Sequence, residues 1–184
     1  MRFRRKRAAR DLSGAEQTGD AQGGGVQDDG VQDGGVQDEA QVLRDLRRVV
    51  DRFGWAVLHG GGGAPGDPRY SYTVGLAAWQ HPEVIVVGLP FQAGETYLNL
   101  VGEAVRAGAR FTPGTTTTAL TDADSPVVFL QVEDTARLTV AEQYNGSAEA
   151  LQLVWPDSTG KLPWEEGHRN PPGAQPLLGP RPAE

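Results

Sequence analysis

The chain has 184 residues, with 17 Lys and Arg against 24 Asp and Glu for a net charge of -7, 25 glycines, 13 prolines and no cysteine. The lack of cysteine excludes a disulfide framework, a thiolate zinc site, an iron–sulfur cluster and a thiol nucleophile. No apolar run reaches the roughly 18 to 20 residues that cross a bilayer, and no apolar segment follows the N-terminal bases as an export signal requires. We therefore expect a cytoplasmic protein with no membrane partner.

The first 37 residues differ in composition from the rest. Residues 1–10 carry six bases and no acid, whereas residues 11–40 carry eight acids and no base. A five-residue repeat rich in Gly, Asp and Gln begins at Val26, Val31 and Val36. One Val per repeat cannot offset the entropy of ordering its neighbours, so residues 1–37 are predicted to form a disordered, low-complexity arm. Nucleic acid is disfavoured as a partner except through the basic residues 1–10, whose attraction would be non-specific.

A single globular domain is predicted for residues 38–168, beginning with an amphipathic helix. Asp38 is a candidate N-cap with Gln41 as its reciprocal partner, and Gly54 suits the left-handed residue that ends a helix. Apolar residues at helical spacing are predicted to lie on a core: Val42, Leu46, Val49, Val50 and Phe53. A first strand at 55–59 and a glycine-rich loop at 60–69 follow.

Two strands are predicted after this loop. Residues 70–76 alternate between bulky and small side chains, with Tyr70, Tyr72, Val74 and Leu76 on one face and Ser71, Thr73 and Gly75 on the other. Residues 84–88 form a continuous apolar run, which is typical of a strand buried on both faces.

The second half completes the predicted fold. Helices are expected at 95–107 and about 135–144, and strands at 115–120, 127–133 and 149–155. Residues 169–184 are expected to form an extended, proline-rich tail. Because strands follow one another more often than they alternate with helices, the predicted class is α+β. It has a mainly antiparallel or mixed sheet of five to six strands with two to three packed helices.

Catalytic and metal motifs are weak. His59 and the glycines after it resemble an oxyanion loop of α/β-hydrolases, but the chain has no Gly-x-Ser-x-Gly nucleophile elbow, so a flexible loop is favoured. Glu165 and His168 have the spacing of half a di-iron site, but Pro163 and Gly167 oppose the helix that such a site needs. We expect no metal and assign no catalytic residue.

A binding site is predicted from polar and aromatic residues at element ends. The small side chains at Thr73 and Gly75 would let a ligand or a helix approach the backbone. His81 has two interpretations. It is either a functional residue that ligates a metal or shuttles a proton, or a turn histidine that is hydrogen-bonded to the backbone. Gln152 interrupts an apolar strand and needs a partner, which is either a ligand or neighbouring backbone. The predicted ligand-binding residues are Tyr72, Thr73, Gly75, His81, Gln152, Trp155, Asp157 and Trp164.

Six ordered motifs also carry a family resemblance. After Phe53-Gly54-Trp55 they are Tyr70 to Leu76, His81 to Glu83, Gly88 to Pro90, Ala150 to Asp157, Gly160 to Trp164 and Gln175 to Gly179. Over about residues 53–179 the chain resembles the bacterial domain-of-unknown-function family 4262 (DUF 4262). The resemblance implies no established activity and no catalytic residues. The loop after His59 is similar to a region of variable length in that family.

Three functions are open at this point. The leading hypothesis is a binding module for a small ligand or a protein partner. The alternative is a flavin- or nucleotide-dependent enzyme of split-barrel type, because Tyr-Thr-Val-Gly-Leu, a Pro-bearing turn and an apolar strand resemble split-barrel flavin reductases. A further alternative is a purely structural or toxin-immunity-like interaction protein whose acidic body would contact a basic surface. No cofactor is assigned.

Overall fold

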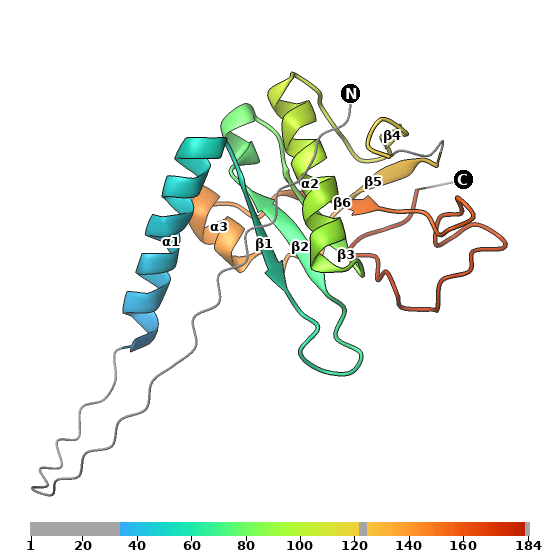
Figure 1. The fold of residues 1–184 in the computed structure, drawn as a ribbon, viewed down its shortest axis with the longest axis horizontal. Helices are drawn as coiled ribbons and strands as arrows, with labels where there is room; N and C mark the ends of the chain where they lie inside the picture. The colour runs from blue at the N-terminus through green and yellow to red at the C-terminus, as the bar shows by residue number, and fades with distance from the viewer. Residues whose placement is uncertain (1–33, 122–124, 183–184) are drawn as a thin grey trace, which may run out of the picture. The chain divides into compact units, whose positions relative to one another are not determined.

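The computed structural model describes residues 34–121 and 125–182, and the predicted disorder of residues 1–33 lies outside this part of the chain. Three α-helices are described there: α1 (Gly34–Phe53), α2 (Phe91–Arg106) and α3 (Thr139–Asn145), with a 3-10 helix η1 (Leu76–Trp79). The strands are β1 (Ala56–Gly60), β2 (Tyr70–Val74), β3 (Glu83–Val87), β4 (Thr116–Thr117), β5 (Val127–Gln131) and β6 (Ala150–Val154). The predicted α+β class is confirmed (Figure 1).

One mixed sheet contains these six strands in the order β1-β2-β3-β6-β5-β4. β3 and β6 run parallel in the centre, and the other neighbouring strands are antiparallel. A parallel pair requires a long crossover connection, which here includes α2, β4, β5 and α3. The order leaves β1 and β4 as the edges of the sheet.

The central strand β3 is buried on both faces, as its apolar run predicts. Val84 and Val86 pack with Leu98 and Val101 of α2 on one face. Ile85 and Val87 pack on the opposite face with residues of α1 and α3. The sheet is therefore covered by α2 on one side and by α1 and α3 on the other (Figure 1).

Both long helices begin earlier than predicted. α1 begins at Gly34, so Asp38 lies inside the helix and its prediction as N-cap is wrong. α2 begins at Phe91, four residues before the predicted start at Glu95. Pro90 directly precedes it with φ -54°, and the fixed φ of proline is already close to a helical value. Pro90, three residues after the end of β3 at Val87, thus starts α2.

The alternation predicted for residues 70–76 ends one residue before Gly75. Tyr72 and Val74 share one face of β2, as expected, and this face lies in the core beneath α1 and α3. Gly75 adopts φ 116°, a left-handed conformation, and turns the chain into η1. Leu76 consequently packs in the core beneath α2, and its predicted place on the face of Tyr72 is wrong.

Part of the proline-rich segment packs against the sheet. Gln175 and Leu178 are buried. The backbone N–H groups of Glu133 and Asp134 both donate to the carbonyl of Leu178, at 2.8 and 3.0 Å. The segment therefore has defined contacts without regular secondary structure. Among the described helices, none combines the length and the apolar character needed to span a membrane.

Candidate functional site

The predicted site residues lie in separate places. Thr73, Gly75 and His81 are near the start of β3, whereas Trp155 and Asp157 follow the end of β6. Because β3 and β6 are parallel, these two groups occupy opposite ends of the pair. Tyr72 is in neither group but in the core between β2 and the helices, where burial and the neighbouring Tyr70 raise its pKa to about 12.

The first group surrounds Glu83, a residue that the sequence did not single out. The Glu83 side chain is only 2% exposed. Its carboxylate accepts hydrogen bonds from Thr73 Oγ1 at 2.6 Å, the Gly75 N–H at 2.7 Å and Asn145 Nδ2 at 2.9 Å. Burial raises the pKa of Glu83, although these hydrogen bonds act in the opposite direction. The carboxylate thus ties the end of β2 to the end of α3.

His81 is bonded to the backbone through both ring nitrogens. Nδ1 lies 2.6 Å from the carbonyl of Pro82, and the Phe111 N–H donates to Nε2 over 3.1 Å. Nε2 must therefore accept and Nδ1 must donate, which requires the neutral ring. Burial lowers the pKa of His81. The geometry supports the turn-histidine interpretation, because protonation would break the bond to Phe111.

A small cavity of about 240 Å³ adjoins Glu83 and His81. Its lining combines apolar and polar residues and contains no Lys or Arg: Ala77, Gln80, His81, Pro82, Glu83, Asn145, Ser147 and Glu149. Gln80 has φ 56°, which is uncommon for a residue other than glycine. Ligand pockets usually measure about 300 to 1,000 Å³. This cavity is below that range and its carboxylate already has protein partners.

Gln152 finds its hydrogen-bond partners in the backbone. Its Nε2 donates to the carbonyl of Pro176 at 2.8 Å, and its Oε1 accepts from the Leu178 N–H at 2.7 Å. Gln175 repeats this arrangement from the other side, since it bonds both the N–H and the carbonyl of Trp155 at 2.9 Å. These two amides fasten residues 175–178 to β6.

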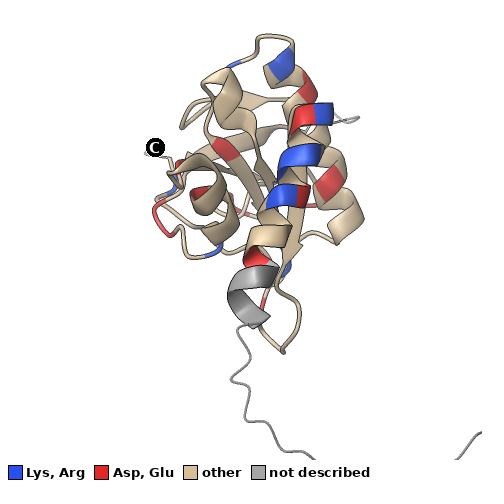
Figure 2. Ribbon diagram, turned by 90° about the vertical axis from the view of Figure 1, so that its left-hand side faces the viewer, with Lys and Arg blue, Asp and Glu red and all other residues tan. Residues whose placement is uncertain are grey.

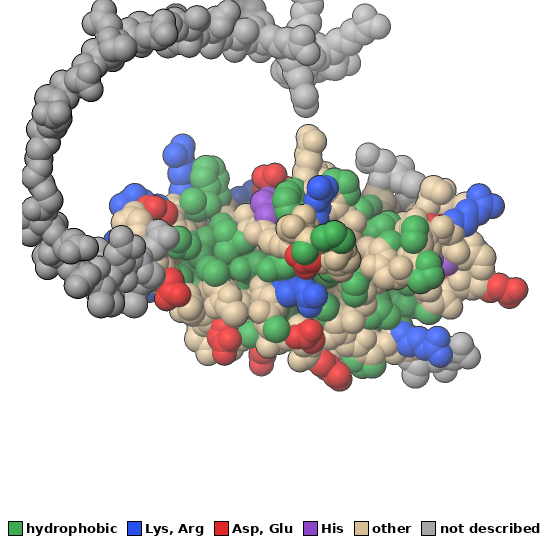
Figure 3. Space-filling view, turned by 90° about the horizontal axis from the view of Figure 1, so that it is seen from below, with side chains coloured by type: hydrophobic (Ala, Val, Ile, Leu, Met, Phe, Trp, Pro, Cys, Tyr) green, Lys and Arg blue, Asp and Glu red, His purple; other side chains and the backbone are tan. Residues whose placement is uncertain are grey.

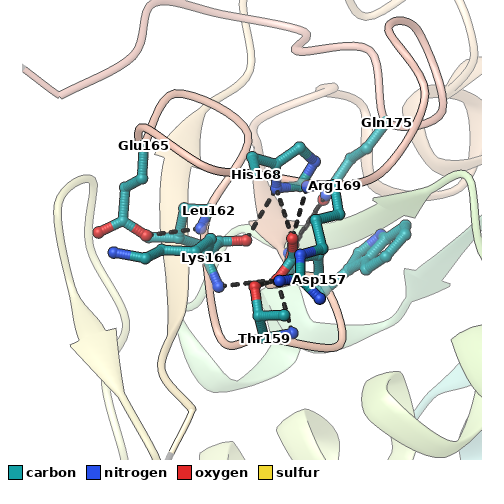
Figure 4. Close-up of polar contacts among 9 residues, drawn as sticks. Asp157, Thr159, Lys161, Leu162, Glu165, His168, Arg169 and Gln175 are labelled. Atoms are coloured by element: carbon teal, nitrogen blue, oxygen red, sulfur yellow. Dashed lines mark hydrogen bonds and ion pairs between the residues drawn. The ribbon is translucent and has the colours of Figure 1, made fainter.

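Asp157 organises the loop after β6 (Figure 4). Its carboxylate accepts from Thr159, from the Lys161 N–H at 3.0 Å and from the Arg169 N–H at 2.6 Å. Burial alone would raise the pKa of Asp157, but these hydrogen bonds outweigh it and hold the pKa well below its ordinary value. His168 is 3.7 Å from the same carboxylate. Trp164 packs on a nearby apolar cluster instead.

Glu165 and His168 also serve the loop. Glu165 accepts from the Leu162 N–H, and His168 Nδ1 lies 2.9 Å from the Lys161 carbonyl. In the part of the chain that the structure describes, no group of three or more His, Asp or Glu side chains is arranged to hold a metal ion. The contacts around Asp157 are therefore those of a loop held by its own side chains.

The structure brings together one pair that the sequence analysis did not connect. His59 Nδ1 is 2.7 Å from Ser71 Oγ across β1 and β2. Ser71 is only 1% exposed, and a Cβ added to Gly94 of α2 would lie 2.8 Å from its hydroxyl. A substrate carbonyl has no route to this oxygen in the packed state. The pair resembles a nucleophile and its base in chemistry but not in access.

A larger cavity of about 700 Å³ lies between α1 and α2, and we call it the α1–α2 groove. Its lining residues come from α1, from the start of β1 and from α2: Val42, Asp45, Leu46, Val49, Phe53, Trp55, Ala56, Val57, Leu58, Glu95, Asn99, Glu103 and Arg106. None of them belongs to the predicted site. The volume is within the usual range of ligand pockets.

The apolar side of α1 corrects the expectation of a helix lying wholly on a core. Leu46 and Val50 are buried, but Val42, Val49 and Phe53 are 46%, 40% and 56% exposed. Figure 2 shows α1 with its charged residues, and Figure 3 shows hydrophobic side chains gathered on one face of the molecule. The helical spacing of apolar residues therefore identified the side of α1 that lines the groove. It could not distinguish the residues that this chain buries from those that it leaves exposed to solvent.

Trp55 fixes the opposite side of the groove. A Cβ added to Gly102 of α2 would lie 2.2 Å from the Trp55 ring, so this close approach requires glycine. Trp55 Nε1 donates to Asn99 at 3.0 Å, and the Arg106 guanidinium lies 5.4 Å from the ring centroid. Arg106 also forms an ion pair with Glu103. The polar side of the groove is thus held in place by α2 and Trp55.

A comparison with known families matches residues 49–169 to the family described as Domain of unknown function (DUF4262). The match spans the groove from Val49 onward and both groups of predicted site residues. No curated protein and no solved structure matches the chain.

Proposed function

Since the chain belongs to the family described as domain of unknown function DUF4262, whose description assigns no activity, we propose from the geometry a role as a binding module. The α1–α2 groove would hold an apolar segment of a protein partner. The observation that carries this proposal is the exposure of Val42, Val49 and Phe53, at positions where an amphipathic helix normally buries its side chains.

Solvent exposure of these side chains has a free-energy cost that a partner can remove. Burying apolar area stabilises a complex by roughly 25 cal/mol per Å², and contiguous exposed apolar patches on proteins often mark interaction sites. The groove also has the mixed lining of a binding site, because Asn99 and Glu103 lie opposite the apolar residues of α1. In the site predicted from the sequence, the buried polar side chains of Thr73, His81, Gln152 and Asp157 already have protein partners, which favours the groove over that site.

Selection of peptides tests this role although the partner is unidentified. A random peptide library is panned against the full chain, and the selected peptides are measured against Val49→Asp. A charge in the groove should weaken them by at least about tenfold, which corresponds to roughly 1.4 kcal/mol. Leu100→Asp is the matched control, because Leu100 is 43% exposed on α2 and does not line the groove. Both variants should keep the melting temperature of the parent.

Two results would refute the proposal. One is the failure of the library to yield any binding peptide, and the other is equal binding to the parent and to Val49→Asp. The enzyme alternative predicts a bound flavin, which the visible absorption spectrum of the purified chain would reveal. The sheet formed by the described strands is open, with β1 and β4 at its edges, rather than closed into a barrel.

A further inference from the structure

The α1–α2 groove runs along the free edge of the sheet. Three consecutive residues of β1, Ala56, Val57 and Leu58, line it. Side chains of consecutive strand residues point to opposite faces, and here Ala56 and Leu58 pack with the α1 and α3 core while Val57 packs with the α2 core. A cavity that touches both sets must pass around the strand edge, so the β1 backbone lies within the groove.

That edge carries unpaired backbone groups. In the described residues β1 pairs with β2 alone, in an antiparallel register from Ala56 with Val74 to Gly60 with Tyr70. An edge strand presents unpaired N–H and C=O groups at alternate residues, and these can accept a further strand. The groove therefore offers main-chain hydrogen bonds in addition to apolar contact.

The two walls of the groove differ in chemistry. The α1 wall is mainly apolar, with Val42, Val49 and Phe53 exposed, and its one acidic residue, Asp45, is paired with Arg48. The α2 wall carries Glu95 and Glu103, together with Arg106. Arg106 is paired with Glu103, whereas Glu95 forms no ion pair with any described residue. The α2 wall thus has an uncompensated negative charge that a basic side chain would complement.

We propose that the occupant of the groove is an extended segment of a partner protein that adds a strand to β1 and alternates apolar with basic residues. The inference rests on the proposed function and gives it a chemical class of ligand. The side chains of an added strand alternate between the two walls. Apolar residues would face Val49 and Phe53 of α1, and Lys or Arg would face Glu95 of α2.

A second copy of this chain fits the groove less well than a single segment. The α1–α2 groove is flanked by both helices in each copy. Two copies that met at their β1 edges would place one groove against the other, and neither groove would be filled. A single extended strand is narrow enough to enter between the helices. We therefore assign the site to a partner segment.

The test uses three heptapeptides and the full chain. One peptide alternates Lys and Val with Lys at both ends, a second has the same composition with Lys and Val in separate blocks, and a third alternates Glu and Val. Fluorescence anisotropy gives the affinities. The alternating Lys peptide should bind at least about tenfold more tightly than the other two. Glu95→Lys should reverse the preference between the Lys and Glu peptides, and Glu142→Lys on α3 is the matched charge control.

Backbone methylation tests the added strand itself. In a strand pair only alternate N–H groups face the neighbouring strand. N-methylation of either all Val or all Lys residues should therefore abolish binding, while methylation of the other set is tolerated. Hydrogen exchange of the β1 amides should slow when the peptide binds.

The outcomes separate this inference from the function on which it rests. Library peptides that depend on Val49 but tolerate both methylation patterns would overturn strand addition and leave the binding module intact. Equal binding of the alternating and block peptides would overturn the alternation. A native mass of a dimer, with β1 amides protected before any peptide is added, would overturn the partner segment in favour of a second copy. Failure of the library selection would refute the proposed function itself.

Discussion

Replacing Gln152 with Leu tests whether residues 175–178 are held by the Gln152 amide. The change keeps a side chain of similar size but leaves the Pro176 carbonyl and the Leu178 N–H without their partner. Gln152 is 0% exposed, so water cannot replace these bonds unless the segment moves. An orphaned buried group costs about 1 to 3 kcal/mol, and two such groups give a loss of about 2 to 6 kcal/mol.

Urea unfolding of parent and variant gives the change in the free energy of unfolding. The whole stability of a domain is about 5 to 15 kcal/mol, so a loss of this size shifts the midpoint clearly. A truncation after Ala174, made in both backgrounds, identifies the route. If Gln152 acts through residues 175–178, truncation costs less in Gln152→Leu than in the parent, and the two changes are not additive. A loss below about 0.5 kcal/mol, or strict additivity, would refute the reasoning.

Three further changes test the other polar and packing contacts. Glu83→Gln keeps an oxygen that can accept from Gly75 and Asn145. Because the folded-state pKa of Glu83 is raised, the parent loses stability as pH rises above 4.5, whereas the variant has no carboxyl group to titrate at this position. Thermal melts over this pH range should therefore show the variant gaining stability relative to the parent. A variant that loses stability relative to the parent as pH rises would contradict this sign. Asp157→Asn should cost stability near neutral pH, and the loss should shrink as pH falls below about 4, where protonation removes the contribution of a carboxyl with a lowered pKa; a loss that is independent of pH would count against it. Gly102→Ala forces a Cβ to 2.2 Å from the Trp55 ring and should cost about 1 to 3 kcal/mol by urea unfolding, whereas Gly63→Ala meets no atom within 4 Å and should be near neutral.

The elements with a strong local pattern could be predicted from the sequence. β3 is a continuous apolar run between a polar start and Gly88, and its burial on both faces follows directly. Element boundaries depended on single residues. Pro90 begins α2 four residues before the predicted start, and Gly75 turns Leu76 from one core to the other.

The site depended on distant partners that no local pattern contains. Gln152 predicted a partner but not its identity, because Pro176 and Leu178 come from a segment for which the sequence predicts an extended tail. Glu83 looks like the polar start of a strand, and its contact with Asn145 spans 62 positions of the sequence. The spacing of apolar residues on α1 predicted that all of them would be buried. Which of these residues the rest of the chain covers depends on how the whole domain folds, and a local pattern does not contain that information.

The buried polar residues and the exposed apolar residues of the α1–α2 groove differ in what a ligand would gain by contacting them. Glu83, Gln152 and Asp157 are buried, and each is hydrogen-bonded to the protein. A ligand at any of them would have to replace bonds that already exist, so it would gain little binding free energy. Val49 and Phe53 have the opposite balance, because water is the contact that a ligand would displace. Binding in the α1–α2 groove therefore needs no rearrangement of the core, and the buried polar residues serve to hold the sheet and helices that form it.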